Sequence, residues 1–219
     1  GKGLGNQFLS DLNEADVLVH VVDFSGKTDS KGEQTEGHDP REDIDFLEDE
    51  LDQWYLGILE KGIERFETKY HGADATIETD LAEQMSAFRT NEDEIKQIIL
   101  AEELDLDPAT WDEEDRASLA REIRKRTKPM VIAANKIDDP AAKENFEEIS
   151  DDPDYDHLTF VPTSAHAEKA LKTAEEAGRV DYTPGAETFD VRGDLSAEQE
   201  AGLDQIQSLL DEFGGTGVQ

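Results

Sequence analysis

The chain has no cysteine among its 219 residues, and it has no apolar run that approaches the length of a membrane span. The absence of cysteine fits a reducing or redox-indifferent interior. The five histidines lack the spacing of metal ligands, so we expect no structural zinc. No signal peptide is recognisable. These absences together predict a soluble, cytoplasmic protein without a metal site.

Positive charge is also scarce. Lys and Arg number 21 against 55 Asp and Glu, which gives a formal net charge of -34 and a pI of about 4.2. Such a charge repels itself in dilute buffer, whereas molar salt shortens the Debye length to about 3 Å and screens most of the repulsion. We therefore predict a halophilic cytoplasm. A docking surface for a basic partner is the alternative; disorder of the whole chain is disfavoured by 36% hydrophobic residues.

A short apolar run, 130–134, ends directly in Asn135-Lys136-Ile137-Asp138. The run suits a buried parallel strand, whose carboxyl end is where open α/β sheets hold ligands. The four residues resemble the Asn-Lys-x-Asp element with which P-loop GTPases read guanine. The Asp138 carboxylate can accept hydrogen bonds from N1 and N2 of guanine, and adenine offers no such pair of donors. Asn135 can face the opposite edge and neighbouring loops, and the Lys136 stem can cover the ring. The alternative is plain turn chemistry.

A second element follows the apolar run 157–161. The residues Pro162-Thr163-Ser164-Ala165-His166 resemble the Ser-Ala loop of GTPases, in which the backbone N–H of the Ala meets guanine O6 and the Ser hydroxyl braces the loop. Small residues are needed there because the main chain approaches the base. Ser164 also suits the N-cap of a helix over 165–177, and both interpretations can hold together.

The amino-terminal residues 1–12 and 16–25 resemble the segment that follows the Asp-x-x-Gly switch motif of the Obg family, with most similarity to archaeal members of its YchF-like branch. The residues 182–185 and 214–219 resemble the approach to the end of that branch's GTPase domain. The resemblance covers 1–52 and 112–219. It implies GTP or GDP with Mg²⁺ as cofactors of the full-length protein, and it makes four residues switch-proximal: Gly1, Lys2, Gly3 and Gly5.

Many YchF-type proteins carry a degenerate Asn-x-x-Glu element and prefer ATP, whereas this chain keeps Asn135, Lys136 and Asp138 intact. The residues therefore favour GTP. An ATP-binding YchF-type ATPase is the alternative within the family.

The phosphate-binding motif Gly-x-x-x-x-Gly-Lys-Ser/Thr occurs nowhere in the chain, and Gly1-Lys2-Gly3 does not replace it, because it lacks a preceding strand and a following hydroxyl residue. The Asp-x-x-Gly motif is absent as well. Since phosphoryl transfer depends on positioning and charge neutralisation around the phosphates, the chain should not hydrolyse nucleotide by itself, and we expect no catalytic residue in it. It is predicted to be a fragment that lacks an N-terminal phosphate loop and a C-terminal TGS domain.

The fold class predicted is α/β, a partial P-loop GTPase (Rossmann-like) three-layer fold with a parallel sheet remnant and an all-α helical insertion. Strands are expected at 17–24, 130–134 and 158–161, side by side, with the first as an edge. Residues 1–52 and 116–219 would form the C-terminal part of the GTPase domain, and 53–115 the helical insertion. Helical spacing of apolar residues over 41–126 supports that insertion, and its aromatic residues, Trp54, Tyr55 and Trp111, are expected to pack inside it.

Two classes of function remain open. One is the guanine-nucleotide-binding part of a translation-associated GTPase whose hydrolysis needs the full-length protein. Its partners would be guanine nucleotide and the ribosome or ribosomal RNA, without DNA or membrane. The other is a non-enzymatic, acidic helical protein-interaction module. The basic run Arg121–Lys128 could contact ribosomal RNA, or it could complement a helix dipole at a helix C-terminus.

Overall fold

The computed structural model of the protein describes residue 12 and the ranges 15–69 and 76–218. The four switch-proximal glycine and lysine positions, Gly1, Lys2, Gly3 and Gly5, lie outside the described residues. The chain divides into two compact units. We call Gly1–Leu18 with Asp45–Met130 the helical unit, and Val19–Ile44 with Val131–Gln219 the sheet unit.

Three strands form a parallel sheet in the order β1-β2-β3: β1 (Leu18–Asp23), β2 (Met130–Asn135) and β3 (Thr159–Pro162). Strand β2 pairs in parallel with β3, in a register that joins Val131 to Thr159. The amide of Phe24 donates to the carbonyl of Asn135 at 3.1 Å at the carboxyl end of β1 and β2. The predicted α/β fold with a parallel sheet remnant is thus confirmed. The carboxyl ends of the three strands lie at the same end of the sheet, which we call its carboxyl edge.

The strands form because apolar side chains alternate between two faces. In β2, Met130, Ile132 and Ala134 are buried, and the residues between them are half-buried. In β1, by contrast, Val19 and Val21 are exposed while Leu18 and Val22 are buried. Strand β1 is one of the two edge strands of this sheet among the described residues, as predicted, and one of its faces is open.

Helix α6 (Pro140–Ser150) starts two residues after Asp138 and packs on the sheet through an aromatic contact. The ring of Phe146 lies 6.3 Å from that of Phe24, which in turn lies 6.4 Å from Phe160 of β3. Asn145 adds a hydrogen bond of 2.7 Å to the carbonyl of Phe24. The start of α6 is fixed by Asp139, whose side chain caps the amide of Ala141, and by Pro140 in the first turn. The end of the loop before α6 is therefore held in place by the helix cap.

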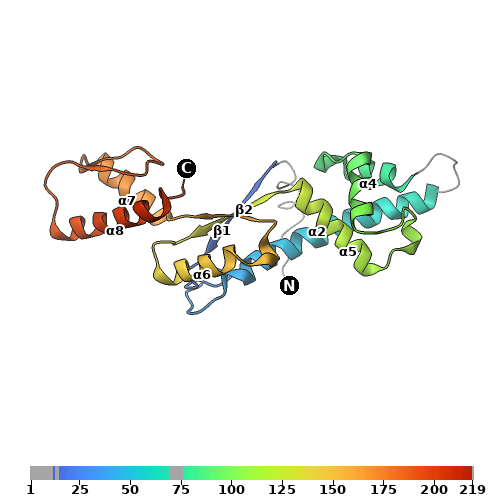
Figure 1. Ribbon diagram of the computed structural model, residues 1–219, viewed down its shortest axis with the longest axis horizontal. Helices are drawn as coiled ribbons and strands as arrows, with labels where there is room; N and C mark the ends of the chain where they lie inside the picture. The colour runs from blue at the N-terminus through green and yellow to red at the C-terminus, as the bar shows by residue number, and fades with distance from the viewer. Residues whose placement is uncertain (1–11, 13–14, 70–75, 219) are drawn as a thin grey trace. The chain divides into compact units, whose positions relative to one another are not determined.

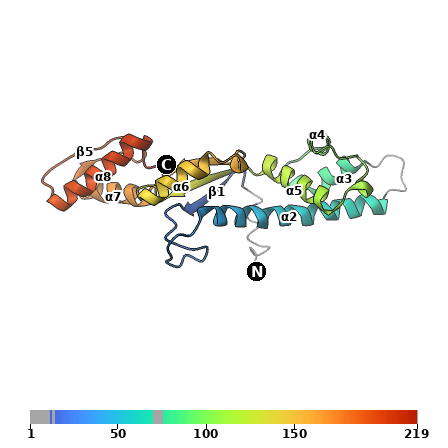
Figure 2. The ribbon, with the colours of Figure 1, turned by 60° about the horizontal axis from the view of Figure 1, so that its bottom comes forward.

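The rest of the sheet unit consists of α7 (Ala165–Glu176), the antiparallel pair β4 (Val180–Asp181) and β5 (Asp190–Val191), and α8 (Ala197–Phe213). Figures 1 and 2 both show α7 and α8 side by side. They share a small core: Leu171, Val180, Tyr182, Leu203 and Leu210. Neither the β4–β5 pair nor α8 was predicted from the sequence. A signal for α8 was present, since Ser196 and Gln199 form a capping box at its start.

The helical unit contains α2 (Pro40–Lys69) from Asp45 onward, α3 (Ile77–Gln84), α4 (Glu92–Ala101) and α5 (Glu113–Thr127), with 3₁₀ turns at Ser86–Phe88 and Pro108–Thr110. Its core includes Tyr55 stacked on Phe88 at 4.2 Å and the buried Trp111, and Trp54 packs against that core. The aromatic residues therefore pack as expected. Helix α2 runs unbroken through residue 53, and α5 runs unbroken through residue 115. The boundaries of the predicted helical insertion, 53–115, stay a prediction.

The basic run at the end of α5 is largely engaged within the helical unit. The guanidinium of Arg124 is 2% exposed and donates to Glu48 at 2.7 Å and also to Asp52. Arg121 lies 3.3 Å from the same Asp52, and Lys128 donates to the carbonyl of Ala15. Burial lowers the pKa of Lys128 from its usual value. The side chains of Arg124 and Lys128 therefore serve packing of this unit.

Candidate functional site

The loops that follow β2 and β3 lie against each other at the carboxyl edge of the sheet. The amide of Thr163 donates to the carbonyl of Ala134 at 2.9 Å, and the amide of Ile137 donates back to the carbonyl of Thr163 at 3.1 Å. These two bonds continue the β2–β3 pairing beyond the strands. The structure thus brings together the five residues predicted to bind guanine: Asn135, Lys136, Asp138, Ser164 and Ala165.

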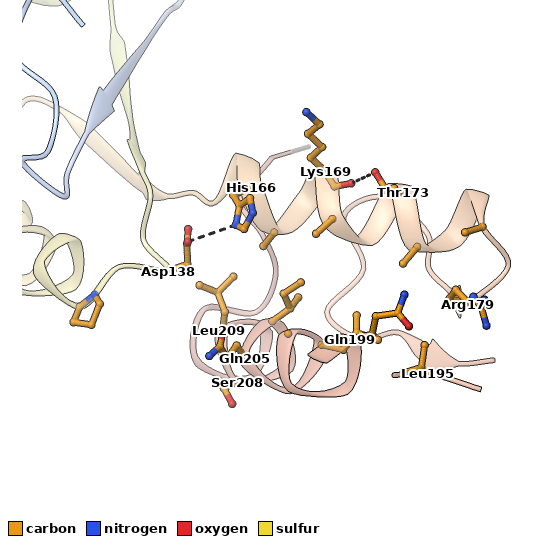
Figure 3. A pocket seen from close by; sticks show the side chains of 18 of the residues that line it. Asp138, His166, Lys169, Thr173, Arg179, Leu195, Gln199, Gln205, Ser208 and Leu209 are labelled. Carbon is orange, nitrogen blue, oxygen red and sulfur yellow. Dashed lines mark hydrogen bonds and ion pairs between the residues drawn. The ribbon is translucent and has the colours of Figure 1, made fainter. Parts of the chain in front are cut away.

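The carboxylate of Asp138 is oriented by a buried hydroxyl. Ser164 is fully buried, and its Oγ donates to Asp138 Oδ1 at 2.6 Å. The Asp138 side chain nevertheless remains 41% exposed, and its Oδ2 lies 3.9 Å from Nδ1 of His166 (Figure 3). One oxygen is therefore fixed while the carboxylate still faces solvent, as a group that receives a ligand must.

Ser164 also caps α7. Its Oγ accepts a hydrogen bond from the amide of Ala167 at 3.1 Å while it donates to Asp138. The two interpretations of Ser164 given by the sequence hold together, because a hydroxyl can donate one hydrogen bond and accept others. The cap fixes the rotamer of Ser164, and the fixed rotamer aims the donor at Asp138.

Asn135 links the two loops on the other side. Its Oδ1 accepts the amide of Ala165 at 3.2 Å. This differs in one respect from the role implied by the resemblance, in which the Ala165 N–H meets the base. In the structure that N–H already has an acceptor, so a bound base oxygen has to share it or displace Asn135.

Lys136 adopts a left-handed conformation, with φ of 68°, which is uncommon outside glycine. Its Nζ lies 2.8 Å from Oδ2 of Asp23, the last residue of β1. Asp23 also accepts hydrogen bonds from Ser25 and Thr28. Burial raises the pKa of Asp23, but the hydrogen bonds from Lys136, Ser25 and Thr28 outweigh it and lower that pKa to about 2. The Lys136 side chain is therefore anchored by a permanent anion.

Asp23 was missed by the sequence analysis, as was a second anchor beside it. Lys27, in the loop after β1, bonds the side chain of Asp139, the residue that follows Asp138 and caps α6. The hydrogen bond from Lys27 is the main cause that lowers the pKa of Asp139. The position of Asp23 at the carboxyl end of an apolar strand was the sequence signal that could have placed it at this site. The 135–139 loop is thus bracketed by the loop after β1 and by the loop after β3.

A groove of about 1120 Å³ opens at Asp138 and His166 and runs between α7 and α8 (Figure 3). Its walls carry apolar residues such as Leu203, Ile206 and Leu209. Asp138 is the one acidic residue among the described residues that line it, in a chain with 55 acidic residues. The candidate site therefore opens toward a surface of a different character from the rest of the chain.

The described residues contain no group of three or more His, Cys, Asp or Glu side chains that could hold a metal ion. Across the same residues, no helix has both the length and the apolar character needed to cross a membrane.

The chain resembles known proteins over its full length. Residues 133–219 match the family described as Obg-like GTPase YGR210-like, G4 motif-containing domain. A GTP-binding protein of Methanocaldococcus jannaschii is 39% identical to the chain over 219 residues; the alignment covers all of this chain and 54% of that protein. A GTP-binding protein of Schizosaccharomyces pombe is 33% identical over 227 aligned residues; the alignment covers all of this chain and 55% of that protein.

A crystal structure of a GTP-binding protein from Pyrococcus horikoshii OT3 matches with a TM-score of 0.73 and 39% identity, over 97% of this chain and 57% of that one. The chain thus spans about half the length of the curated relatives that it matches. These similarities agree with the parallel sheet and the two loops at its edge. The chain is therefore similar to Obg-like GTPases, and residues 133–219 match that family's G4 motif-containing domain.

Proposed function

We propose that the chain binds the guanine base of GTP or GDP at the edge of its sheet. The observation that carries the proposal is the half-exposed carboxylate of Asp138, held at one oxygen by the buried Ser164 hydroxyl. Guanine presents two adjacent donors, N1–H and N2–H, that pair with such a carboxylate. The relatives that share the whole length of this chain are named GTP-binding proteins, which supports the same ligand.

The neighbouring residues have complementary roles in this proposal. Asn135 joins the two loops and faces the opposite edge of the base, together with the Ala165 amide. The anchor at Asp23 holds Lys136 extended, so that its aliphatic stem can cover the ring. Because these side chains are held by hydrogen bonds before the base arrives, little conformational entropy is lost on binding.

The 219 residues contain neither the phosphate-binding motif nor the Asp-x-x-Gly switch motif. We therefore propose GTP hydrolysis and Mg²⁺ binding only for a full-length protein that carries both motifs. The intact Asp138 favours GTP over the ATP preferred in the YchF-like branch. A role in translation through the ribosome is a further proposal. Arg124 and Lys128 take no direct part in it, because both side chains are buried within the helical unit.

Nucleoside binding tests the base-reading proposal without requiring a phosphate site. Saturation-transfer NMR, which detects millimolar binding, is expected to show contact of guanosine with the chain and none of adenosine. Adenosine lacks the paired donors, and its approach would leave the Asp138 carboxylate without a partner. Equal signals from guanosine and adenosine would refute guanine recognition, and a preference for adenosine would support the ATP-using alternative.

We also propose that the protein works in a salt-rich cytoplasm, because of its net charge of -34. Raising KCl from about 0.1 M to 1 M shortens the Debye length from about 10 to about 3 Å and weakens the repulsion between its carboxylates. A gain of about 2 kcal/mol in unfolding free energy would raise the thermal midpoint by about 4–8 °C. Calorimetry at the two salt concentrations measures this. An unchanged or lower midpoint in 1 M KCl would argue for a low-salt environment.

A further inference from the structure

The segment that follows α8 packs directly on the Ser164 loop. Helix α8 ends at Phe213 and is capped by Gly214 in a left-handed conformation, and the following Gly217 lies against Pro162 at the end of β3. The amide of Ser164 donates to the carbonyl of Thr216 at 2.8 Å. A Cβ placed on Gly217, where φ is 69°, would lie 2.1 Å from the carbonyl oxygen of Pro162. Only glycine permits this close approach, so the segment is fitted to the loop.

A buried carboxylate holds this segment in place. Glu168, on the first turn of α7, is 3% exposed, and its Oε2 accepts hydrogen bonds from Thr216 Oγ1 at 2.7 Å and from Tyr182 Oη at 2.6 Å. Lys172 Nζ lies 3.1 Å from the other carboxylate oxygen. Burial raises the pKa of Glu168, but the hydrogen bonds from Tyr182, Thr216 and Lys172 outweigh it and lower that pKa. The carboxylate is thus kept ionised in a buried position.

These contacts form a chain that leads to the base-reading group. Glu168 fixes Thr216 through its hydroxyl, and the Thr216 carbonyl fixes the Ser164 amide. The Ser164 hydroxyl in turn fixes Asp138. A buried charge is expensive unless it is fully partnered, and an apolar residue at 168 would fill the same space without that cost. The presence of a charged Glu168 next to Ser164 therefore needs a reason beyond packing.

We propose that Glu168 and Thr216 are positioning residues for guanine recognition. They hold the Ser164 loop so that its hydroxyl keeps the Asp138 carboxylate in the orientation that receives the base. This inference rests on the proposed function of the site. It makes the affinity for guanine depend on the segment after α8, which does not itself touch the base.

Thr216→Val removes the hydroxyl and preserves the shape, and Tyr182→Phe is its matched control. Both hydroxyls donate to the same oxygen of Glu168. The Thr216 hydroxyl also accepts a hydrogen bond from the Val218 amide at 3.4 Å, and the Tyr182 hydroxyl accepts one from the Gly185 amide at 3.1 Å. Thr216 bonds the Ser164 amide directly through its carbonyl, whereas Tyr182 reaches the Ser164 loop only through Glu168 and Thr216. Thr216→Val is expected to weaken guanosine binding about tenfold, the effect of misplacing one hydrogen bond of about 1.4 kcal/mol. Tyr182→Phe should change the affinity less than twofold, and Thr216→Ser should restore it.

Guanosine titration followed by NMR, together with amide hydrogen exchange at Ser164, decides the matter. We expect faster exchange at Ser164 in Thr216→Val than in Tyr182→Phe. Equal losses of affinity in the two variants would show a merely structural network and overturn the proposal, as would unchanged affinity in Thr216→Val. If the unaltered chain bound no guanosine, the proposed function would fail. The exchange rates would still decide whether Thr216 positions the loop.

Discussion

Asp138→Asn is expected to reverse the base preference of the chain from guanosine to xanthosine. The carboxylate accepts from both N1–H and N2–H of guanine, whereas an amide can accept only one of them and places its own donor against the other. Xanthine carries an oxygen at C2, which matches that donor. Hydrogen bonds to a charged group contribute about 1.5–3 kcal/mol each, so guanosine affinity should fall about a hundredfold. Competition between the two nucleosides in ligand-observed NMR measures the reversal.

The adjacent Asp139 offers a matched control. Asp139→Asn removes the same charge one residue away, and Asn is as good an N-cap for α6 as Asp. The control should therefore keep the guanosine preference, although it weakens the contact with Lys27. Ser164 can still donate to an amide oxygen at position 138, so Asp138→Asn should leave the fold intact. Retention of guanosine preference in Asp138→Asn would reject this residue as the base reader.

The meeting of the two loops could be predicted from sequence because both follow apolar runs. Parallel strands end at a common edge, so residues placed directly after β2 and β3 had to come close together. The bond between Ser164 and Asp138 is the result. The strand ends were predicted within one residue for the same reason, since burial on the sheet demands continuous apolar runs.

The supports of the site could not be predicted in the same way. Asp23 and Lys136 are 113 residues apart, and Glu168 and Thr216 are 48 apart. Such pairs depend on how β1 and the segment after α8 return to the edge, and no local periodicity encodes that return. The left-handed backbone at Lys136 is likewise imposed by its surroundings, because propensity alone disfavours it. Local chemistry thus identified the residues that face the base, and tertiary contacts supplied those that hold them.

The largest effect on stability is expected for Arg124→Met in the helical unit. Arg124 is 2% exposed, and its partners Glu48 and Asp52 are only 12% and 14% exposed. Removing the guanidinium takes away the buried cation that the two carboxylates share and leaves the exposed Arg121 beside Asp52. Breaking a buried ion pair in this way costs about 3–5 kcal/mol, which is a large part of the stability of an ordinary domain. Urea unfolding followed by circular dichroism measures the loss.

Arg121→Met is the control, because Arg121 lies on the same helix and pairs with the same Asp52 at 3.3 Å but is 45% exposed. An exposed pair contributes about 0–1 kcal/mol, and salt screens it further. The Arg121 effect should therefore fade in 1 M KCl, while the Arg124 effect persists. Equal losses for both variants would mean that burial does not set the strength of this network.

A triple replacement separates the cost of an unpaired charge from the loss of an attraction. Glu48 and Asp52 are four residues apart and both face Arg124, so Glu48→Leu and Asp52→Leu should remove both carboxylates that Arg124 pairs with. If desolvation dominates, adding these changes to Arg124→Met restores most of the lost stability, as replacement of whole buried ion pairs by apolar residues often does. If the attraction itself dominates, the triple variant stays as unstable as the single one. The attraction of Arg124 to these two carboxylates would then be the term that stabilises the helical unit.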